Sequence, residues 1–281
     1  MRIVFFTRVG FRSDELFSYM FSRVARHFPN VRVVVVAPQE PKLRALSTLL
    51  SRHWRKVRRL GLLSSLEILS SYPLQVWCAS RDDKRVQQLL QQLPRPALTV
   101  DTDRVAYVQS ANGADAVQAM RLLRPDVIIQ AGAGILRPLV FQTARLGTVN
   151  LHHGIAPLIR GMNSIYWALS ERRADWLGST VHWVDEGVDT GAVLAYASVT
   201  PQFPGEGYPA LFARATQKGV DELVAALIRL EAGEKWIVHP PAHTSVYRST
   251  MSGWRLLAVR VRLTLQRLTH RFHRATAISR D

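Results

Sequence analysis

The fold is decided by residues 1–37, MRIVFFTRVGFRSDELFSYMFSRVARHFPNVRVVVVA. Residues 2–6 and 31–37 are apolar runs of the length expected for buried strands. A helical pattern lies between them at residues 13–27, with Ser13 as its expected cap and Pro29-Asn30 as its breaker. Apolar strands that alternate with helices are typical of a parallel sheet buried on both faces, so the sequence predicts a doubly wound α/β fold.

The alternation continues farther along the chain. Strands are predicted at residues 105–109, 126–130 and 148–151, with a helix at 113–123 that ends before Pro125. From Gly178 the pattern becomes antiparallel, because the β-rich runs GSTVHWV and AVLAYASV are joined by a glycine-containing loop, DEGVDTG. We therefore expect an antiparallel hairpin at about residues 178–199.

Amphipathic helices are predicted toward the end of the chain. One covers residues 207–232 and another begins at Gly253, giving a helical C-terminal region. Residues 41–96 fit the strand and helix alternation poorly, and we interpret them as a basic insertion at the edge of the sheet. The sequence thus predicts a catalytic domain at residues 1–232, followed by a loop and a basic amphipathic helix at 233–281.

Composition narrows the class of protein. The chain has 281 residues and a single cysteine, Cys78, and no Cys and His cluster has the spacing of a zinc site, so we expect no metal. The first apolar run is too short for a signal peptide, and no window approaches the roughly 18 apolar residues of a membrane span. We expect a cytoplasmic protein, either free or attached peripherally at the inner membrane face.

The formal net charge of +16 is concentrated in two basic stretches, at about residues 42–59 and 253–274. Both combine arginines with leucines, which suits an anionic partner such as a membrane surface. A nucleic acid is the less favoured partner, and a solvated basic helix face is the structural alternative. The sequence leaves the oligomeric state open.

Two further stretches carry the chemistry: GTVNLHHGIAPLIRGMNSIYWAL at residues 147–169 and GSTVHWVDEGVDTGAVL at 178–194. A strand at 148–151 places Asn150 and His152 on one side at its carboxyl end, where open α/β sheets bind ligands. An Asn amide can donate to a developing oxyanion, and an imidazole can relay a proton. Asp189 could orient the imidazole. The pair of Asn150 and His152 suits transfer of an acyl group. Because no serine or cysteine completes a nucleophilic triad, we expect the amine that accepts the acyl group to attack it directly.

These stretches resemble the folate-dependent formyltransferase family, which includes glycinamide ribonucleotide, methionyl-tRNA and amino-sugar N-formyltransferases. The matching positions are Asn150, His152, Pro157, Arg160, Gly161, Trp167, Ala168, Asp189, Thr190 and Gly191. The resemblance implies a Rossmann-like sheet with helices on both faces, 10-formyltetrahydrofolate as the formyl donor, and Asn150, His152 and Asp189 as catalytic residues.

The resemblance also implies binding residues. The folate would contact two segments, made of Gly132, Ala133, Gly134, Ile135 and Leu136, and of Val184, Asp185, Glu186 and Gly187. Arg160 and Gly161 would bind the substrate, although Arg160 could instead brace its loop. His182 is expected to pack beside the site, and the stretch from His239 to Arg248 is a candidate acceptor loop.

Departures from the family pattern limit what can be said of the acceptor. His153-Gly154 replaces a Pro-Ser pair, and TRVGFRSDE replaces the Gly-Ser-Asn loop of glycinamide ribonucleotide formyltransferase. The region after residue 200 is short for the β-barrel of methionyl-tRNA formyltransferase. We therefore favour transfer to the primary amine of a small molecule, a nucleotide- or lipid-linked amino sugar. The alternatives are a formyltetrahydrofolate hydrolase, a glycinamide ribonucleotide formyltransferase, or an inactive member that binds nucleic acid.

Overall fold

A computed structural model of the protein describes residues 1–37, 66–67, 70–239 and 244–278. Within them a seven-stranded sheet has the order β3-β2-β1-β4-β5-β7-β8. Its strands are β1 (Ile3–Arg8), β2 (Arg32–Val36), β3 (Val105–Val108), β4 (Val127–Ala131), β5 (Gly147–His152), β7 (Gly178–Trp183) and β8 (Val193–Ser198). The first five pair in parallel, whereas β7 runs antiparallel to both β5 and β8. The predicted α/β class and the hairpin at 178–199 are confirmed.

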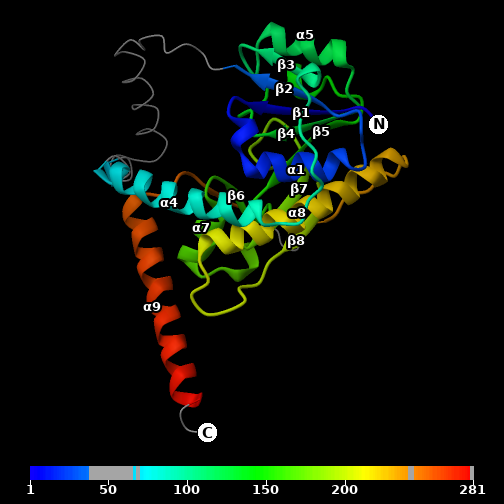
Figure 1. Ribbon diagram of the computed structural model, residues 1–281. Helices are drawn as coiled ribbons and strands as arrows, with labels where there is room; N and C mark the ends of the chain where they lie inside the picture. Colours follow the sequence, from blue (N-terminus) through cyan, green and yellow to red (C-terminus); the bar gives the residue numbers. More distant parts are fainter. Residues whose placement is uncertain (38–65, 68–69, 240–243, 279–281) are drawn as a thin grey trace.

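Helices cover both faces of the sheet (Figure 1). On one face, α1 (Glu15–Ala25) and α8 (Tyr208–Glu231) pack against alternate strand residues such as Phe5. On the other, α5 (Ala114–Leu123) and the short α6 (Pro138–Phe141) pack against residues such as Phe6. Successive strand side chains point to opposite faces, so a continuous apolar strand supplies both cores.

The start of α1 differs in detail from the prediction. The cap is Asp14, whose carboxylate accepts hydrogen bonds from the backbone N–H groups of Leu16 and Phe17. Ser13 instead donates its hydroxyl to the carbonyl of Gly10 and ends a 3-10 turn, η1 (Phe11–Ser13). Ser and Asp are both favourable N-cap residues. Because η1 ends at Ser13, Asp14 is the residue that directly precedes α1.

Three more helices lie outside these layers: α4 (Tyr72–Gln91), which runs alongside α8 in Figure 1, α7 (Ser164–Glu171) and α9 (Gly253–Ile278). Part of the segment interpreted as an insertion, residues 41–65 and 68–69, lies outside the described residues. Its remainder includes α4, which contacts α1, α8 and α9. Two 3-10 turns, η2 (Thr102–Arg104) and η3 (Ala174–Trp176), complete the helical elements described.

A buried carboxylate ties this group of helices together. Asp82 of α4 is 6% exposed, accepts a hydrogen bond from the Tyr166 hydroxyl of α7, and pairs with Arg260 of α9. The Tyr166 ring stacks on Tyr208 of α8, with 3.8 Å between ring centroids. One ion pair therefore connects helices that the chain separates widely.

A second, two-stranded sheet joins β6 (Ile159–Gly161) to β9 (Val246–Arg248) in parallel. The sequence did not predict it. Hydrogen bonds extend the contact, from Met162 N to Arg248 O at 2.9 Å and from the Trp167 indole to Ser249 O at 2.9 Å. The loop after β5 is thereby fixed by a segment just before α9.

Replacing Asp82 with Ala should destabilise the protein by about 3 kcal/mol, because Arg260 and the Tyr166 hydroxyl would lose their partner in a largely buried position. Urea unfolding measures this change. Asp175→Ala is the matched control, since its pair with Arg173 is half exposed and contributes far less. Equal losses of stability in the two variants would contradict this account of Asp82.

Candidate active site

The strand register brings the catalytic candidates together. In the antiparallel pair of β5 and β7, Asn150 lies opposite His182 and His152 lies opposite Thr180. Asp189 lies in the loop between β7 and β8, where its φ of 52° is left-handed, a region that Asp tolerates better than most residues. The three predicted catalytic residues thus meet at the carboxyl end of β5.

His182 connects Asn150 to Asp189. Its Nδ1 lies 2.7 Å from the carbonyl oxygen of Trp183, which assigns the proton to Nδ1 and leaves Nε2 as an acceptor. The Asn150 amide nitrogen lies 3.2 Å from that Nε2, and Asp189 Oδ1 lies 3.5 Å from it. One amide hydrogen of Asn150 is therefore held by His182, and the other remains to donate elsewhere.

His152 is 7% exposed and both of its ring nitrogens have neighbours. Nε2 lies 3.2 Å from the carbonyl oxygen of Ile159 and 3.3 Å from the Ser164 hydroxyl, and Nδ1 lies 3.4 Å from Asp189 Oδ2. Burial lowers the pKa of His152 below its ordinary value, and Asp189 partly opposes this shift. A neutral ring that donates from Nε2 to Ile159 presents an unprotonated Nδ1 beside a carboxylate.

Asp189 stays ionised although it is largely buried. Burial by itself raises the pKa of Asp189, but its interactions with His182, His152 and the Gly161 N–H outweigh that effect and hold the pKa at about 2. The Gly161 N–H donates to Oδ2 at 2.9 Å. Because Gly161 belongs to β6, the β6-β9 sheet positions a donor to the Asp189 carboxylate.

Arg160 braces two loops. Its Nε donates to the Ser245 hydroxyl at 2.7 Å, and a terminal nitrogen donates to the carbonyl oxygen of Val188 at 3.1 Å. Of the two roles that the sequence left open for this side chain, the observed contacts are those of a brace between β6, the Asp189 loop and the residues before β9. In the candidate acceptor loop, residues 240–243 lie outside the described residues, and Arg248 pairs with Glu171 at 2.8 Å.

The two segments expected to bind folate lie close together. Ala133 and Val184 pack against one hydrophobic cluster, in which Leu136 is buried. Gly132 and Gly134 both have positive φ, and a Cβ added to either would meet no atom within 4 Å, so each faces open space. Ile135 is 74% exposed.

Side chains hold these two segments in place, and sequence reasoning missed Asn112 while expecting Asp185 only as a folate contact. Asn112 donates to the Ile135 carbonyl at 2.9 Å and accepts from Arg137 N at 2.6 Å. In the second segment, Asp185 accepts from Gly187 N at 3.0 Å and from the Thr190 hydroxyl at 2.6 Å. Glu186, which lies between Asp185 and Gly187, is exposed.

A pocket of about 480 Å³ opens beside Asn150. Its wall includes the end of β1, the end of β4 and the first turns of α1, and its lining residues include Arg8, Asp14, Gln130, Gly132, Asn150 and His153. The His153 ring stacks on Phe212 with 4.1 Å between centroids, and its Nε2 lies 2.8 Å from the Thr216 hydroxyl. The pocket has the size and position of a substrate site.

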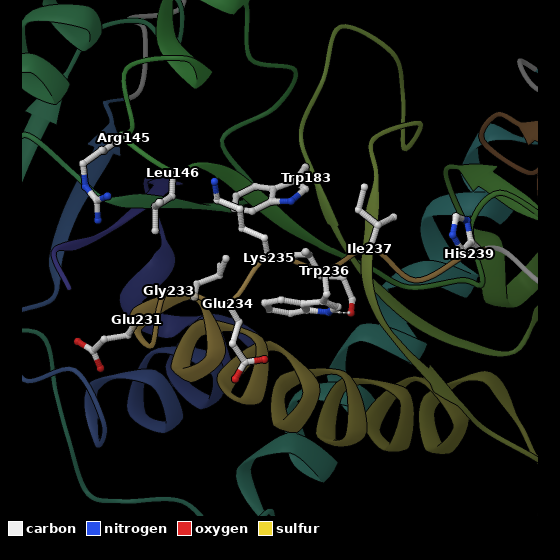
Figure 2. A pocket seen from close by; sticks show the side chains of 12 residues that line it. Arg145, Leu146, Trp183, Glu231, Gly233, Glu234, Lys235, Trp236, Ile237 and His239 are labelled. Atoms are coloured by element: carbon white, nitrogen blue, oxygen red, sulfur yellow. Dashed lines mark hydrogen bonds between the residues drawn. The ribbon is translucent and has the colours of Figure 1, made fainter.

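Figure 2 shows a different cavity, of about 900 Å³, between the indoles of Trp183 and Trp236. None of Asn150, His152 and Asp189 lines it. Across the described part of the chain, no group of three or more His, Cys, Asp or Glu side chains could hold a metal ion. The pocket beside Asn150 is therefore the better candidate for the chemistry.

Sequence reasoning also missed or underrated several members of the site. His182 was expected only to pack nearby, yet it contacts both Asn150 and Asp189. The Ile159 carbonyl and Ser164 gave no sequence signal, because their role depends on a turn that brings them back to His152. Alternation along residues 178–183 could have placed Thr180 and His182 on one face, but only the register sets His182 opposite Asn150.

Several known proteins are similar to this chain in sequence. The chain is 36% identical over 121 residues to a methionyl-tRNA formyltransferase of Synechococcus sp. (strain JA-3-3Ab), which is 43% of this chain and 37% of that protein. It is also 32% identical over 179 residues to a methionyl-tRNA formyltransferase of Syntrophus aciditrophicus (strain SB), and this match covers 60% of this chain and 55% of that protein. The matched regions thus span little more than half of these relatives at most.

Solved structures share the fold. A sugar N-formyltransferase from Shewanella sp. FDAARGOS_354 superposes with a TM-score of 0.52 at 14% identity, covering 94% of this chain and 88% of that one. HypX from Aquifex aeolicus, in complex with tetrahydrofolic acid, superposes with a TM-score of 0.51 at 18% identity, covering 90% of this chain and 30% of that one. A family model described as formyl transferase matches residues 74–227, more than half of the chain. This chain belongs to the formyl transferase family.

Proposed function

We propose that the protein transfers a formyl group from 10-formyltetrahydrofolate to a primary amine of a small acceptor. The observation that carries the proposal is the cluster of Asn150, His152, His182 and Asp189, with a pocket of about 480 Å³ beside Asn150. When bound, the folate donor supplies the formyl group. The residues of the chain then have to polarise the formyl oxygen, take a proton from the amine and exclude competing water.

Asn150 is assigned the first role. His182 holds one amide hydrogen of Asn150 at an N···N distance of 3.2 Å, which fixes the plane of the amide. The second hydrogen can then donate to the formyl oxygen as negative charge develops there, and donors positioned in advance for such charge lower reaction barriers. The same amide lines the pocket, where the acceptor would approach.

His152 and Asp189 are assigned the proton transfer. The neutral His152 ring has Nδ1 available, because Nε2 is positioned to donate to the Ile159 carbonyl. A proton that leaves the attacking amine for Nδ1 creates an imidazolium 3.4 Å from the ionised Asp189. The carboxylate stabilises that cation, as the acidic member of a catalytic triad does. His152 can then give the proton to the donor nitrogen as the bond between that nitrogen and the formyl carbon breaks.

The two segments near Leu136 and Val184 fit the donor. Gly132 and Gly134 open toward free space, Ala133 and Val184 give apolar contact, and the nearby backbone offers amide and carbonyl groups for a pterin ring. Folate binding by these segments remains an expectation from the family resemblance. The bound tetrahydrofolic acid of HypX, a protein of the same fold, supports it.

An amino sugar linked to a nucleotide or a lipid is the acceptor that we favour. The pocket has room for a sugar-sized group, and Arg8 and Gln130 at its edge offer a positive charge and an amide to an anionic, hydroxylated molecule. The structural likeness to a sugar N-formyltransferase adds support. A tRNA acceptor is less favoured, although relatives in sequence carry that name.

Single replacement of Asn150, His152 or Asp189 by Ala should lower the rate of formyl transfer by about 10²–10⁴-fold, because each removes a group that acts on the reacting atoms. Turnover with 10-formyltetrahydrofolate and a panel of amino sugars measures the effect. His27→Ala, an exposed histidine outside the site, is the matched control. Near wild-type rates for two of the three variants would exclude this assignment.

Hydrolysis of the donor is the main alternative, and the same three residues could serve it. Formate release at an enzymatic rate with no amine present would favour the hydrolase. Formate release that stays slow while an amino sugar is formylated would favour transfer. The lined pocket beside Asn150 is the reason to expect the second result, since water needs no such space.

The pKa of His152 should lie below 6.5, and in Asp189→Asn it should fall further, because the carboxylate that favours the protonated ring is gone. The ring then stays neutral as the pH falls below 6.5, so the acid limb of the pH-rate profile should also lie below that value. NMR titration of histidine-labelled protein measures the pKa, with His152→Gln to assign the resonance. A pKa at or above 6.5 would contradict the proposed proton acceptor.

A further inference from the structure

Helix α9 has two apolar stripes, and only one of them contacts the rest of the protein. Leu256, Val259 and Leu263 are at most 7% exposed and pack against α7 and its neighbours. The second stripe consists of Trp254, Val261, Leu265 and Leu268, which are 50–57% exposed. We call these four residues the outer stripe. A helix that needed only to dock on the protein would carry polar residues there.

The outer stripe is a continuous band. Its members follow one another at intervals of seven, four and three residues, the spacing that places side chains on one face of a helix. At about 100° per residue, that face points away from Leu256, Val259 and Leu263. Figure 1 shows α9 extending away from the body of the protein, so the band lies along a projecting element.

Positive charge flanks this band. Arg262 and Arg267 lie on opposite sides of the helix, between the outer stripe and the buried one, and their guanidinium groups donate to carbonyl and hydroxyl oxygens. The sequence from Met251 to Ile278 contains no acidic residue. An apolar face between arginines is the pattern of helices that lie in the interface of an anionic bilayer, with the apolar side chains among the lipid tails.

We infer that the outer stripe of α9 binds the surface of an anionic membrane. A second copy of the chain fits this face less well, because pairing two such helices would bring Arg262 and Arg267 of both copies together, and α9 itself carries no acidic residue to offset them. RNA could bind the arginines, but it would leave the apolar outer stripe exposed to water. No helix in the described parts of the chain is long and apolar enough to cross a membrane, so the contact is peripheral.

Membrane contact through α9 would place the active site near the lipid. The helix begins a few residues after β9, which pairs with β6 and so supports Asp189. The backbone between them is fixed as well, through Met251 N to Asn163 Oδ1 at 3.2 Å and Gly253 N to Ser71 Oγ at 2.9 Å. If the proposed transferase function holds, this surface favours the lipid-linked form of the amino-sugar acceptor.

Cosedimentation of the full chain with vesicles tests the inference. We expect binding to vesicles that contain phosphatidylglycerol, weaker binding to phosphatidylcholine alone, and loss of binding at high salt. The double variant L265E/L268E should lower the partition coefficient by at least about tenfold, because two leucines no longer enter the lipid. L122E is the matched control, since Leu122 of α5 is 75% exposed on another surface.

The charge contribution has its own pair of variants. Arg267→Gln should weaken binding to the anionic vesicles about fivefold, whereas Arg121→Gln on α5 should leave it unchanged. Equal binding by wild type and L265E/L268E would overturn the inference. So would a wild-type dimer that L265E/L268E converts to a monomer with no vesicle binding in either form, or salt-sensitive RNA binding without vesicle binding.

These assays need no folate and no acceptor, so they are independent of the proposed reaction. Vesicle binding without formyl transfer would retain the membrane surface and remove the transferase. Formyl transfer to a soluble amine without vesicle binding would do the reverse. Because none of the four residues of the outer stripe belongs to the site described above, L265E/L268E should formylate a soluble acceptor at the wild-type rate.

Discussion

The carboxylate of Asp189 is a negative charge held inside the protein, and the arrangement of the site depends on it. A buried charge is costly unless charges and hydrogen bonds around it replace water. Here the Gly161 N–H donates a hydrogen bond to the carboxylate, and the interactions of Asp189 with His182, His152 and Gly161 keep its pKa at about 2. His152 and His182 are in turn oriented by carbonyl oxygens, which leaves each ring one nitrogen that faces the acid.

Distant parts of the chain contribute to stabilising the buried Asp189 carboxylate. The Gly161 N–H is presented by β6, and β6 is paired with β9, so residues near the end of the chain support a group at its centre. Asp82 makes a similar connection through Tyr166 and Arg260, which joins α4, α7 and α9. The sheet supplies the position of Asn150 and His152, but this outer scaffold supplies the surroundings in which Asp189 stays charged.

The sequence predicted those features that are written in local patterns. Apolar runs and turn residues located the main strands and helices, and the sequence also predicted that Asn150, His152 and Asp189 would lie together. It could not predict β6 and β9, because each has only three residues and the two strands lie far apart in the sequence. The role of His182 depends on a strand register, and that of Asn112 on a contact between loops. Neither leaves a periodic signal.

The pairing of β6 with β9 also bears on how the molecule matures during synthesis. The five parallel strands, β7 and β8 are all translated before residue 200, so the sheet can assemble while the ribosome is still adding the C-terminal region. The strand that steadies Gly161 emerges much later. A nascent chain would thus carry a formed sheet with Asn150 and His152 in register, but its carboxylate would lack support until β9 arrived. Under the proposed function, formyl transfer would therefore require synthesis of β9 as well as of the main sheet.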